Sequence, residues 1–151
     1  MKLAVGSDER TELSDFVLRE LEKRGFRVET YGALRNEAVP WPGVAVQVAE
    51  SVADGRCDEG VLMCWTGTGV TIAANKVPGV RAALCADAAT AAGARRWNHA
   101  NVLALSLRLT SVPVAGEILD AWFSASPGDG EDATNVARIA ELERRYLEGR
   151  K

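Results

Sequence analysis

The stretch Val61–Lys76, VLMCWTGTGVTIAANK, constrains the fold of this chain more than any other part of the sequence. An apolar run, Gly60–Met63, predicts a buried strand that stops at Cys64. A turn of small residues, Trp65–Gly69, follows, and Val70–Lys76 is compatible with a helix. Glycines let the backbone approach a ligand, and the first N–H groups of a helix have no partner within it. We therefore expect this turn, called the cradle below, to bind an anion beside a thiol whose thiolate it would stabilise.

Strand and helix patterns alternate along the rest of the chain. Short apolar runs predict four further strands, and stripes of apolar residues predict helices between them, with Thr11 and Asp87 as N-caps and Gly25 as a terminator. Such alternation predicts an α/β fold with a five-stranded parallel sheet covered by helices on both faces. The other predicted strands are Leu3–Gly6, Phe26–Tyr31, Val80–Cys85 and Val102–Leu105, with loops over 32–42 and 124–133.

Ligands of such sheets bind at the carboxyl ends of the strands, where the winding order of the chain reverses. This rule places Asp8, Cys64 and the loop near Trp97 at one rim. Asp8 is then a candidate binding residue, with a turn cap or helix cap as the alternative. A cysteine that ends an apolar strand is also typical of plain core packing, and only the adjacent cradle favours a chemical role for Cys64.

Length and charge narrow the class of protein. A chain of 151 residues fits one domain, and a net charge of −3 lacks the excess of basic residues that nucleic-acid binding requires. Neither a signal peptide nor a membrane span is indicated, so we expect a cytoplasmic protein whose ligand is a small molecule. Three cysteines and one histidine indicate neither a disulfide framework nor a metal site.

Two longer blocks carry a specific resemblance. Met63–Lys76 followed by Pro78–Cys85 resembles the signature of the ribose-5-phosphate isomerase B family, which includes the galactose-6-phosphate isomerase subunits. Arg95–Leu105 resembles a second block of that family, and Ser7-Asp8 its N-terminal one. The similarity covers about residues 1–139. It implies a Rossmann-like three-layer sandwich that interconverts aldose and ketose phosphates without a cofactor or metal.

The resemblance assigns roles to particular residues. Cys64 matches the base of one family branch, whereas the other branch has a glutamate at the position of Val70. Thr66 matches a hydroxyl that assists the thiol, and Asn98 matches a donor to the substrate oxygens. The N–H groups of Gly67 to Val70 would hold an enediolate oxygen. The expected catalytic residues are thus Cys64, Thr66 and Asn98, and the expected substrate-binding residues are Asp8, Glu9, Trp65, Gly67, Thr68, Gly69, Val70, Trp97 and Arg108.

Some positions depart from the family pattern. Glu9 follows Asp8 where the family has histidine, and Trp97 replaces the histidine that opens the sugar ring. Trp65 stands where the family has glycine. An acyclic substrate such as a tetrulose phosphate would need no ring opening, and it competes with ribose 5-phosphate as the expected substrate. Trp65 and Trp97 would stack over the substrate, or else pack at a dimer interface.

The phosphate-binding residues also differ. The two family arginines that clamp phosphate fall on Glu131 and Asn135, while Arg108 matches a further family arginine. Three arginines near these positions are candidates for a rebuilt clamp: Arg10, Arg95 and Arg138. His99 could relay a proton or be structural.

The family also implies an assembly. It forms homodimers or homotetramers whose sites are completed by a second subunit, and the C-terminal helix, about 134–148, is expected to pack on that partner. A rival hypothesis is a non-catalytic domain that binds a sugar phosphate. Cys64 separates the two, because a binding module needs no thiol base.

Overall fold

A five-stranded, all-parallel sheet forms the centre of the computed structural model, which describes residues 1–149. Its strands lie in the order β2-β1-β3-β5-β4, and every pairing is parallel. The predicted five-stranded parallel sheet is therefore confirmed. The strands are β1 (Lys2–Ser7), β2 (Arg27–Gly32), β3 (Glu59–Cys64), β4 (Ala82–Leu84) and β5 (Val102–Ser106).

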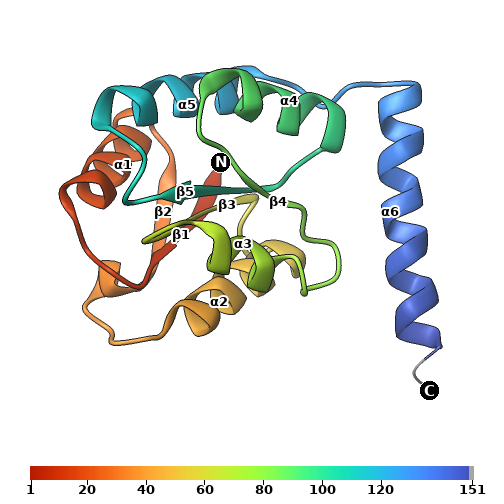
Figure 1. Ribbon diagram of the computed structural model, residues 1–151, viewed down its shortest axis with the longest axis horizontal. Helices are drawn as coiled ribbons and strands as arrows, with labels where there is room; N and C mark the ends of the chain where they lie inside the picture. Colours follow the sequence, from red (N-terminus) through yellow and green to blue (C-terminus); the bar gives the residue numbers. More distant parts are fainter. Residues whose placement is uncertain (150–151) are drawn as a thin grey trace.

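Helices cover both faces of this sheet, which makes the expected three-layer sandwich (Figure 1). One layer consists of α1 (Glu12–Lys23), α4 (Ala88–Asn98) and α5 (Val112–Ser124). The other consists of α2 (Trp41–Ala53) and α3 (Thr68–Ala74). A last helix, α6 (Glu131–Glu148), stands beside the sandwich and outside both layers.

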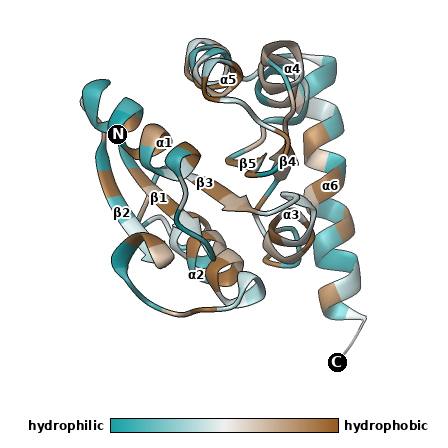
Figure 2. Ribbon diagram, turned by 60° about the vertical axis from the view of Figure 1, so that its left-hand side comes forward, coloured by the Kyte–Doolittle hydropathy of each residue, from teal (hydrophilic) through white to brown (hydrophobic). Residues whose placement is uncertain are grey.

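Strand alternation divides the core into two apolar clusters. Val61 and Met63 pack with the layer of α1, α4 and α5, whereas Leu62 and Cys64 pack with the layer of α2 and α3. Figure 2 shows β3 as an apolar strand enclosed between the two layers. Because β3 is buried on both faces, its sequence is a continuous apolar run, as parallel strands require.

The predicted caps are confirmed in two helices. The Ser14 backbone N–H donates to Thr11 Oγ1 at 3.3 Å at the start of α1, and the Thr90 N–H donates to Asp87 Oδ1 at 2.7 Å at the start of α4. Gly25 follows α1 with φ of 79°, the left-handed conformation that glycine adopts without strain. These contacts orient the helices that return the chain across the sheet.

The segment 32–42 differs from the expected loop. A single 3-10 turn occupies Ala33–Arg35, and α2 begins at Trp41. Pro42 lies in the first turn of α2, where its fixed φ is compatible with a helix and its missing N–H is no loss. The start of α6 at Glu131 likewise shortens the expected loop over 124–133.

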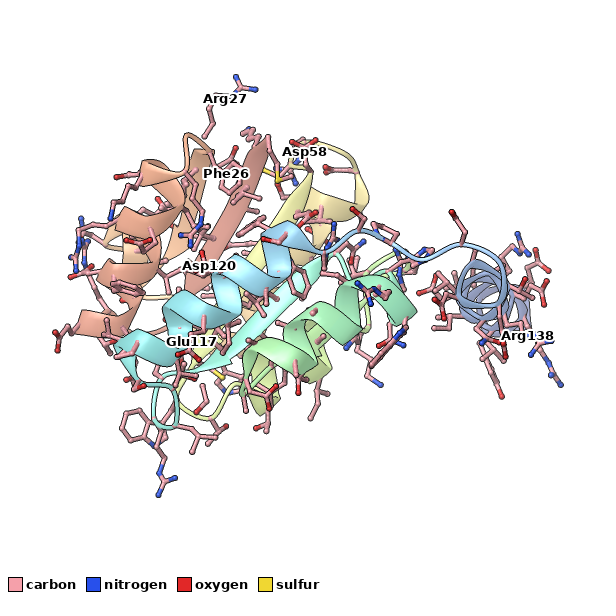
Figure 3. All side chains as sticks on the ribbon, turned by 90° about the horizontal axis from the view of Figure 1, so that it is seen from above. Phe26, Arg27, Asp58, Glu117, Asp120 and Arg138 are labelled. Atoms are coloured by element: carbon pink, nitrogen blue, oxygen red, sulfur yellow. The ribbon has the colours of Figure 1, made fainter. Side chains whose placement is uncertain are left out.

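α6 buries none of its described residues. Among the helices and strands it contacts α4 most, and Figure 3, looking down its axis, shows it set apart from the layers. Within residues 1–149, no helix combines the length and apolar character needed to cross a membrane.

Candidate functional site

Asp8 and Cys64 meet where the winding order of the sheet reverses. β2 lies on one side of β1 and β3 on the other, so the switch point falls between β1 and β3. Ser7 pairs with Met63 at the end of the ladder, which brings Asp8 and Cys64 side by side at the carboxyl edge. By alternation both side chains point toward the layer of α2 and α3, as Gly6 does against Val44. The sequence expectation for this pair is confirmed in position.

The Asp8 carboxyl group is partly withdrawn from water. Its Oδ1 atom is buried and accepts no hydrogen bond from residues 1–149. Burial raises the pKa of this carboxyl, against smaller opposing contributions from backbone N–H groups. The next residue, Glu9, is exposed, and its carbonyl accepts a hydrogen bond from Ser7 Oγ at 2.6 Å. Asp8 thus places at this edge one buried acceptor oxygen without a hydrogen-bond partner in the described chain.

The cradle has a backbone that only glycine can follow. Gly67 has φ of 75°, and a Cβ there would lie 2.5 Å from Leu84 Cδ1 and 3.0 Å from the Leu105 backbone. Thr71 Oγ1 donates to the Gly67 carbonyl at 2.6 Å, which stabilises the turn from the helix side. The N–H groups of the first turn of α3 are left without helical partners. This arrangement suits an oxyanion close to the backbone.

Two hydroxyl groups lie at the surface of the cradle. Thr66 Oγ1 and Thr68 Oγ1 are 2.7 Å apart, and both residues are exposed. Cys64, by contrast, is only 5% exposed and is one of the free cysteines. The thiol is therefore buried, whereas the two hydroxyls that follow it along the chain are open to solvent.

β5 fixes the other side of the cradle. Cys64 pairs with Ser106, and the Leu107 N–H donates to the Cys64 carbonyl at 3.0 Å. The Trp65 carbonyl accepts from Ser106 Oγ at 3.0 Å and from the Arg108 N–H at 2.9 Å. The Trp65 backbone is thus held while its indole is 54% exposed. Arg108 is exposed at the same edge, where it could reach an anion.

Trp41 is a neighbour of the cradle that the sequence analysis missed. A Cβ on Gly69 would lie 2.9 Å from Cε3 of Trp41, so the indole rests against the backbone of the cradle helix. Trp41 is 42% exposed, at the first turn of α2 on the face to which Asp8 and Cys64 point. Because the sequence predicted a loop over 32–42, it did not indicate that Trp41 begins a helix beside the cradle. Its position makes it a wall of the site.

Trp97 and Asn98 lie at the opposite edge of the sheet, so the expectation that the loop near Trp97 shares a rim with Asp8 and Cys64 is wrong. Trp97 and Asn98 end α4, which runs back across the sheet toward Val102, and Val102 pairs with Gly60 near the start of β3. Four residue steps from Gly60 to Cys64 span roughly 13 Å. Helices return antiparallel to the strands, so residues that follow a helix reach the amino edge. Both side chains are exposed there.

The candidate phosphate clamp is not assembled in one chain. Arg10 is at the carboxyl edge, but its Nε is 2.8 Å from Asp15 Oδ1. Arg95 is buried at the amino edge in an ion pair with Glu59, which rules out contact with a phosphate at the cradle. Arg138 projects from α6, apart from the sandwich, together with Glu131 and Asn135 on the same helix (Figure 3).

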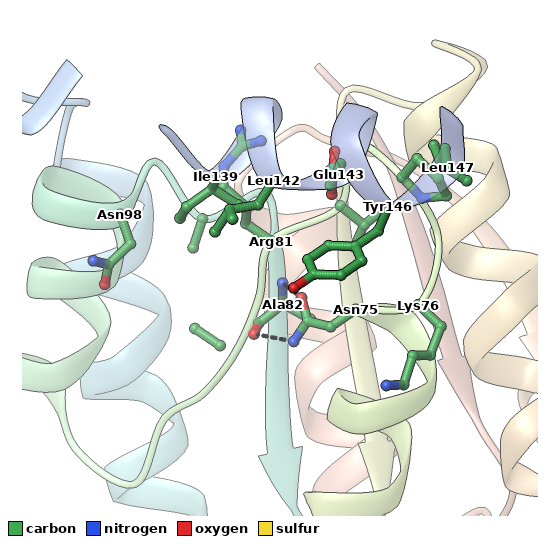
Figure 4. A pocket seen from close by; sticks show the side chains of 14 residues that line it. Asn75, Lys76, Arg81, Ala82, Asn98, Ile139, Leu142, Glu143, Tyr146 and Leu147 are labelled. Carbon is green, nitrogen blue, oxygen red and sulfur yellow. Dashed lines mark hydrogen bonds between the residues drawn. The ribbon is translucent and has the colours of Figure 1, made fainter. Parts of the chain in front are cut away.

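A cavity of about 630 Å³ lies between α6 and the edge strand β4 (Figure 4). The apolar side chains of α6 line one wall, and Asn98, Arg81 and Asn75 are among the residues of the other. None of the cradle residues lines it. We interpret this cavity as space left under a helix with no buried residue, rather than as the reaction site.

The remaining reactive side chains have structural environments. His99 has a left-handed backbone, and its Nε2 lies 2.8 Å from the Gly128 carbonyl oxygen at the amino edge. Burial raises the pKa of Cys85 to about 12, as for a thiol packed in the core. Among residues 1–149, no three or more His, Cys, Asp or Glu side chains gather as metal ligands would.

Comparison with known proteins decides the family. The model described as Ribose/Galactose Isomerase matches residues 3–139. The chain belongs to this family. The resemblance expected from the sequence is confirmed, and so is the Rossmann-like α/β class.

Individual family members match over nearly their whole length. Ribose-5-phosphate isomerase B of Escherichia coli is 37% identical over 95% of this chain and 97% of its own. D-erythrulose-4-phosphate isomerase of Pectobacterium atrosepticum is 36% identical over 95% of each chain. The structure of ribose-5-phosphate isomerase B from Clostridium thermocellum superposes with a TM-score of 0.91 at 41% identity, covering 97% of this chain and 99% of the other. By name these family members are sugar-phosphate isomerases, the class of enzyme expected from the sequence.

Proposed function

We propose that this chain is a sugar-phosphate isomerase that uses Cys64 as its base. The observation that carries the proposal is the placement of the Cys64 thiol beside Asp8, beneath a glycine cradle at the switch point of the sheet. Membership of the family supplies the reaction class, and the cradle supplies a place for the charge that the reaction develops.

The proposed reaction moves one proton between neighbouring carbons. The Cys64 thiolate removes the proton from C2 of the aldose, and the C–H electron pair forms the C1–C2 double bond as the C1 carbonyl oxygen becomes an oxyanion. The N–H groups of Gly67 to Val70 hold that oxyanion in a cis-enediolate. Thr66 supports the thiol, and Asp8 binds substrate hydroxyls. Return of the carbon-bound proton from Cys64 to C1, with transfer of the C2 hydroxyl proton to the C1 oxyanion, gives the ketose with its C2 carbonyl and C1 hydroxyl.

A second copy of the chain completes the site in this proposal. Trp97 and Asn98 lie at the edge away from Cys64, so they reach a cradle only across a subunit interface. The apolar residues of α6 are exposed, as expected of a helix that packs on a partner. We therefore propose a homodimer, or a homotetramer built from it, and no nucleic-acid or membrane partner.

Two substrate classes fit this site. Ribose 5-phosphate is the substrate that the name of the Escherichia coli relative suggests, and a short acyclic ketose phosphate is the one suggested by the Pectobacterium relative. The indoles of Trp41 and Trp65 narrow the opening, and Trp97 cannot relay the proton needed for ring opening. These features favour the acyclic class. Turnover of ribose 5-phosphate with none on open-chain tetrulose phosphates would overturn that preference.

Replacement of Cys64 by serine tests the proposed base. Exchange of the substrate C2 hydrogen with solvent deuterium should fall by about 10²- to 10⁴-fold, because a serine hydroxyl is a far weaker base than a thiolate. Ligand binding, followed by calorimetry, should survive. Unchanged exchange would show that another group is the base. Binding without exchange in the wild-type protein would favour the non-catalytic domain.

A further inference from the structure

Three buried side chains form a polar cluster at the amino edge of the sheet, away from the cradle. Glu59, the first residue of β3, accepts the Trp122 indole N–H on Oε2 at 2.7 Å. Its Oε1 lies 2.7 Å from Arg95 Nη2, and the Arg95 guanidinium stacks 5.3 Å from the Trp122 ring centroid. The Arg95 side chain is only 14% exposed. We call these residues the Arg95 cluster.

The Arg95 cluster is not an obvious source of stability. Burial raises the pKa of Glu59, which shows that its charge is poorly solvated despite its partners. Arg95 Nε is buried without a partner among residues 1–149. Buried ion pairs of this kind are often no more stable than apolar residues of similar volume, and they can instead select one arrangement of the chain. The question is then which arrangement this cluster selects.

One hydrogen bond from the cluster, together with two from outside it, fixes the backbone that follows α4. Arg95 Nη1 donates to the Ala100 carbonyl at 2.5 Å, and Arg81 Nε donates to the His99 carbonyl at 2.9 Å. On the far side, the Gly128 N–H donates to the Arg96 carbonyl at 2.8 Å. The carbonyl of residue 96 is therefore held from the segment before α6, that of residue 99 from the residue before β4, and that of residue 100 from α4 itself.

That segment carries two exposed side chains that form no hydrogen bonds with the described residues. Trp97 is 58% exposed and its ring rests on Gly93, while Asn98 is exposed. Neither side chain makes a hydrogen bond to another residue in the described part of the chain. A fixed backbone that presents two free side chains is what a preorganised contribution to a neighbouring site requires.

We propose that the Arg95 cluster positions Trp97 and Asn98 for the active site of a second copy of this chain. Arg95 and Glu59 are positioning residues, because they act through Asn98 and touch no substrate. The proposal rests on the isomerase function proposed above. It assigns a buried ion pair of one subunit to the catalysis of its partner, at a cradle that the same subunit's own Asn98 does not reach.

Heterodimers with separated lesions test this directly. The variants Arg95→Met and Cys64→Ser are combined in dimers isolated through two different affinity tags. In the trans arrangement, one subunit carries R95M and the other C64S. The remaining cysteine site then receives Asn98 from a subunit with an intact cluster, so about half of the wild-type turnover is expected, from one of the two sites.

The cis arrangement provides the opposite case. One subunit carries both R95M and C64S, and its partner is wild type. The single cysteine site now receives a mispositioned Asn98, so turnover should be about 10- to 100-fold below that of the trans dimer, mainly in kcat. Higher turnover in the cis dimer, or equal turnover in the two, would overturn the proposal. If R95M impaired only the cradle of the subunit that carries it, the cis dimer would be the more active one, because its cysteine site lies in the wild-type subunit.

Two further variants serve as a control and as a substitute for R95M. Arg56→Met removes a surface ion pair with Asp54 and should leave both turnover and KM unchanged. Glu59→Gln keeps an acceptor for Trp122 but leaves Arg95 without its counter-ion, so it should reproduce the cis–trans difference if R95M fails to fold. A wild-type chain that turns over no sugar phosphate refutes the proposed function, whereas an active wild type with a fully active R95M refutes only the positioning role.

Discussion

At the scale of single residues, the site depends on one position that tolerates no side chain and on another that needs a carboxylate. Gly67 combines a positive φ with close contact to the Leu105 backbone, and Asp8 holds a carboxylate oxygen that no other described residue satisfies. Cys64 and Asp8 could be placed from the sequence, because each ends an apolar strand and parallel strands end at one edge. Trp41 could not be placed, since its contact with Gly69 is a tertiary one that no local pattern encodes.

Replacing Gly67 by alanine should lower the free energy of unfolding by about 2–4 kcal/mol, since a left-handed φ and an overpacked Cβ both oppose it. Urea unfolding measures this loss. Gly79→Ala is the matched control, because Gly79 has φ of 84° with nothing within 4 Å of its Cβ position. That control should lose only about 1–2 kcal/mol. Equal losses would mean that contacts at Gly67 contribute nothing.

Asp8→Asn should stabilise the protein at pH 7 while it impairs catalysis. Because burial raises the pKa of Asp8 in the folded state, the unfolded chain releases the proton first, and stability falls as the pH rises from the unfolded value of 3.8 through the folded value. The asparagine variant escapes this loss. Urea unfolding at pH 7 should therefore favour the variant, with the difference vanishing below pH 3.8.

Asp87→Asn should show the opposite trend. The Thr90 backbone N–H lowers the pKa of Asp87, so the stability it contributes is present above pH 3.8 and is lost as the pH falls through its lower folded value. The asparagine variant lacks this pH dependence.

A D8N variant that is less stable than wild type at pH 7 would contradict the account given for Asp8.

At the scale of elements, short connections determine which side chains surround the cradle. The order of strands and helices was predictable from alternating patterns, but two boundaries were not. The first turn of α2 carries Pro42, a residue typical of loops and of helix starts alike, so its sequence cannot distinguish the two. The loop near Trp97 was expected at the wrong edge because the rule for strand ends was applied to a loop that follows a helix, and α4 returns the chain to the amino edge.

Trp41→Ala should reduce kcat/KM by roughly three- to tenfold, in line with the loss of one aromatic contact worth about 1 kcal/mol. The indole bridges α2 to the cradle helix through Gly69, so its removal also widens the opening. Steady-state kinetics on a short and a longer sugar phosphate should show relaxed discrimination against the longer one. Ile72→Ala, an exposed change on α3, should alter neither value; a similar effect of both variants would remove Trp41 from the site.

At the scale of the whole molecule, α6 touches α4 but buries none of its residues against the described part of the chain. Ile139, Leu142 and Tyr146 are exposed on the side of α6 that faces the cavity. Apolar periodicity predicted this helix correctly but could not tell whether its stripe packs in the same chain or on another. A single chain thus contains every residue of the proposed site, but Trp97 and Asn98 lie away from its own cradle.

Leu142→Glu should weaken self-association by about 30-fold or more in Kd, because a charge buried without a partner costs about 2 kcal/mol or more. Light scattering coupled to gel filtration over a dilution series measures the change. Ala140→Glu is the matched control, since this exposed position of α6 does not line the cavity. A wild-type chain that stays monomeric at all concentrations would remove the assembly from the proposal.

The four tryptophans make the molecule its own optical reporter. Trp122 is completely buried, so its emission should be blue-shifted and insensitive to added quenchers. Trp41, Trp65 and Trp97 are each about half-exposed and emit from water. Subunit assembly should shield Trp97 before any ligand is present, and a ligand in the assembled site should then dim or shift the emission of Trp41 and Trp65. Assembly and ligand binding should therefore be separable in the unlabelled protein by a dilution series without ligand, followed by a ligand titration of the assembled protein.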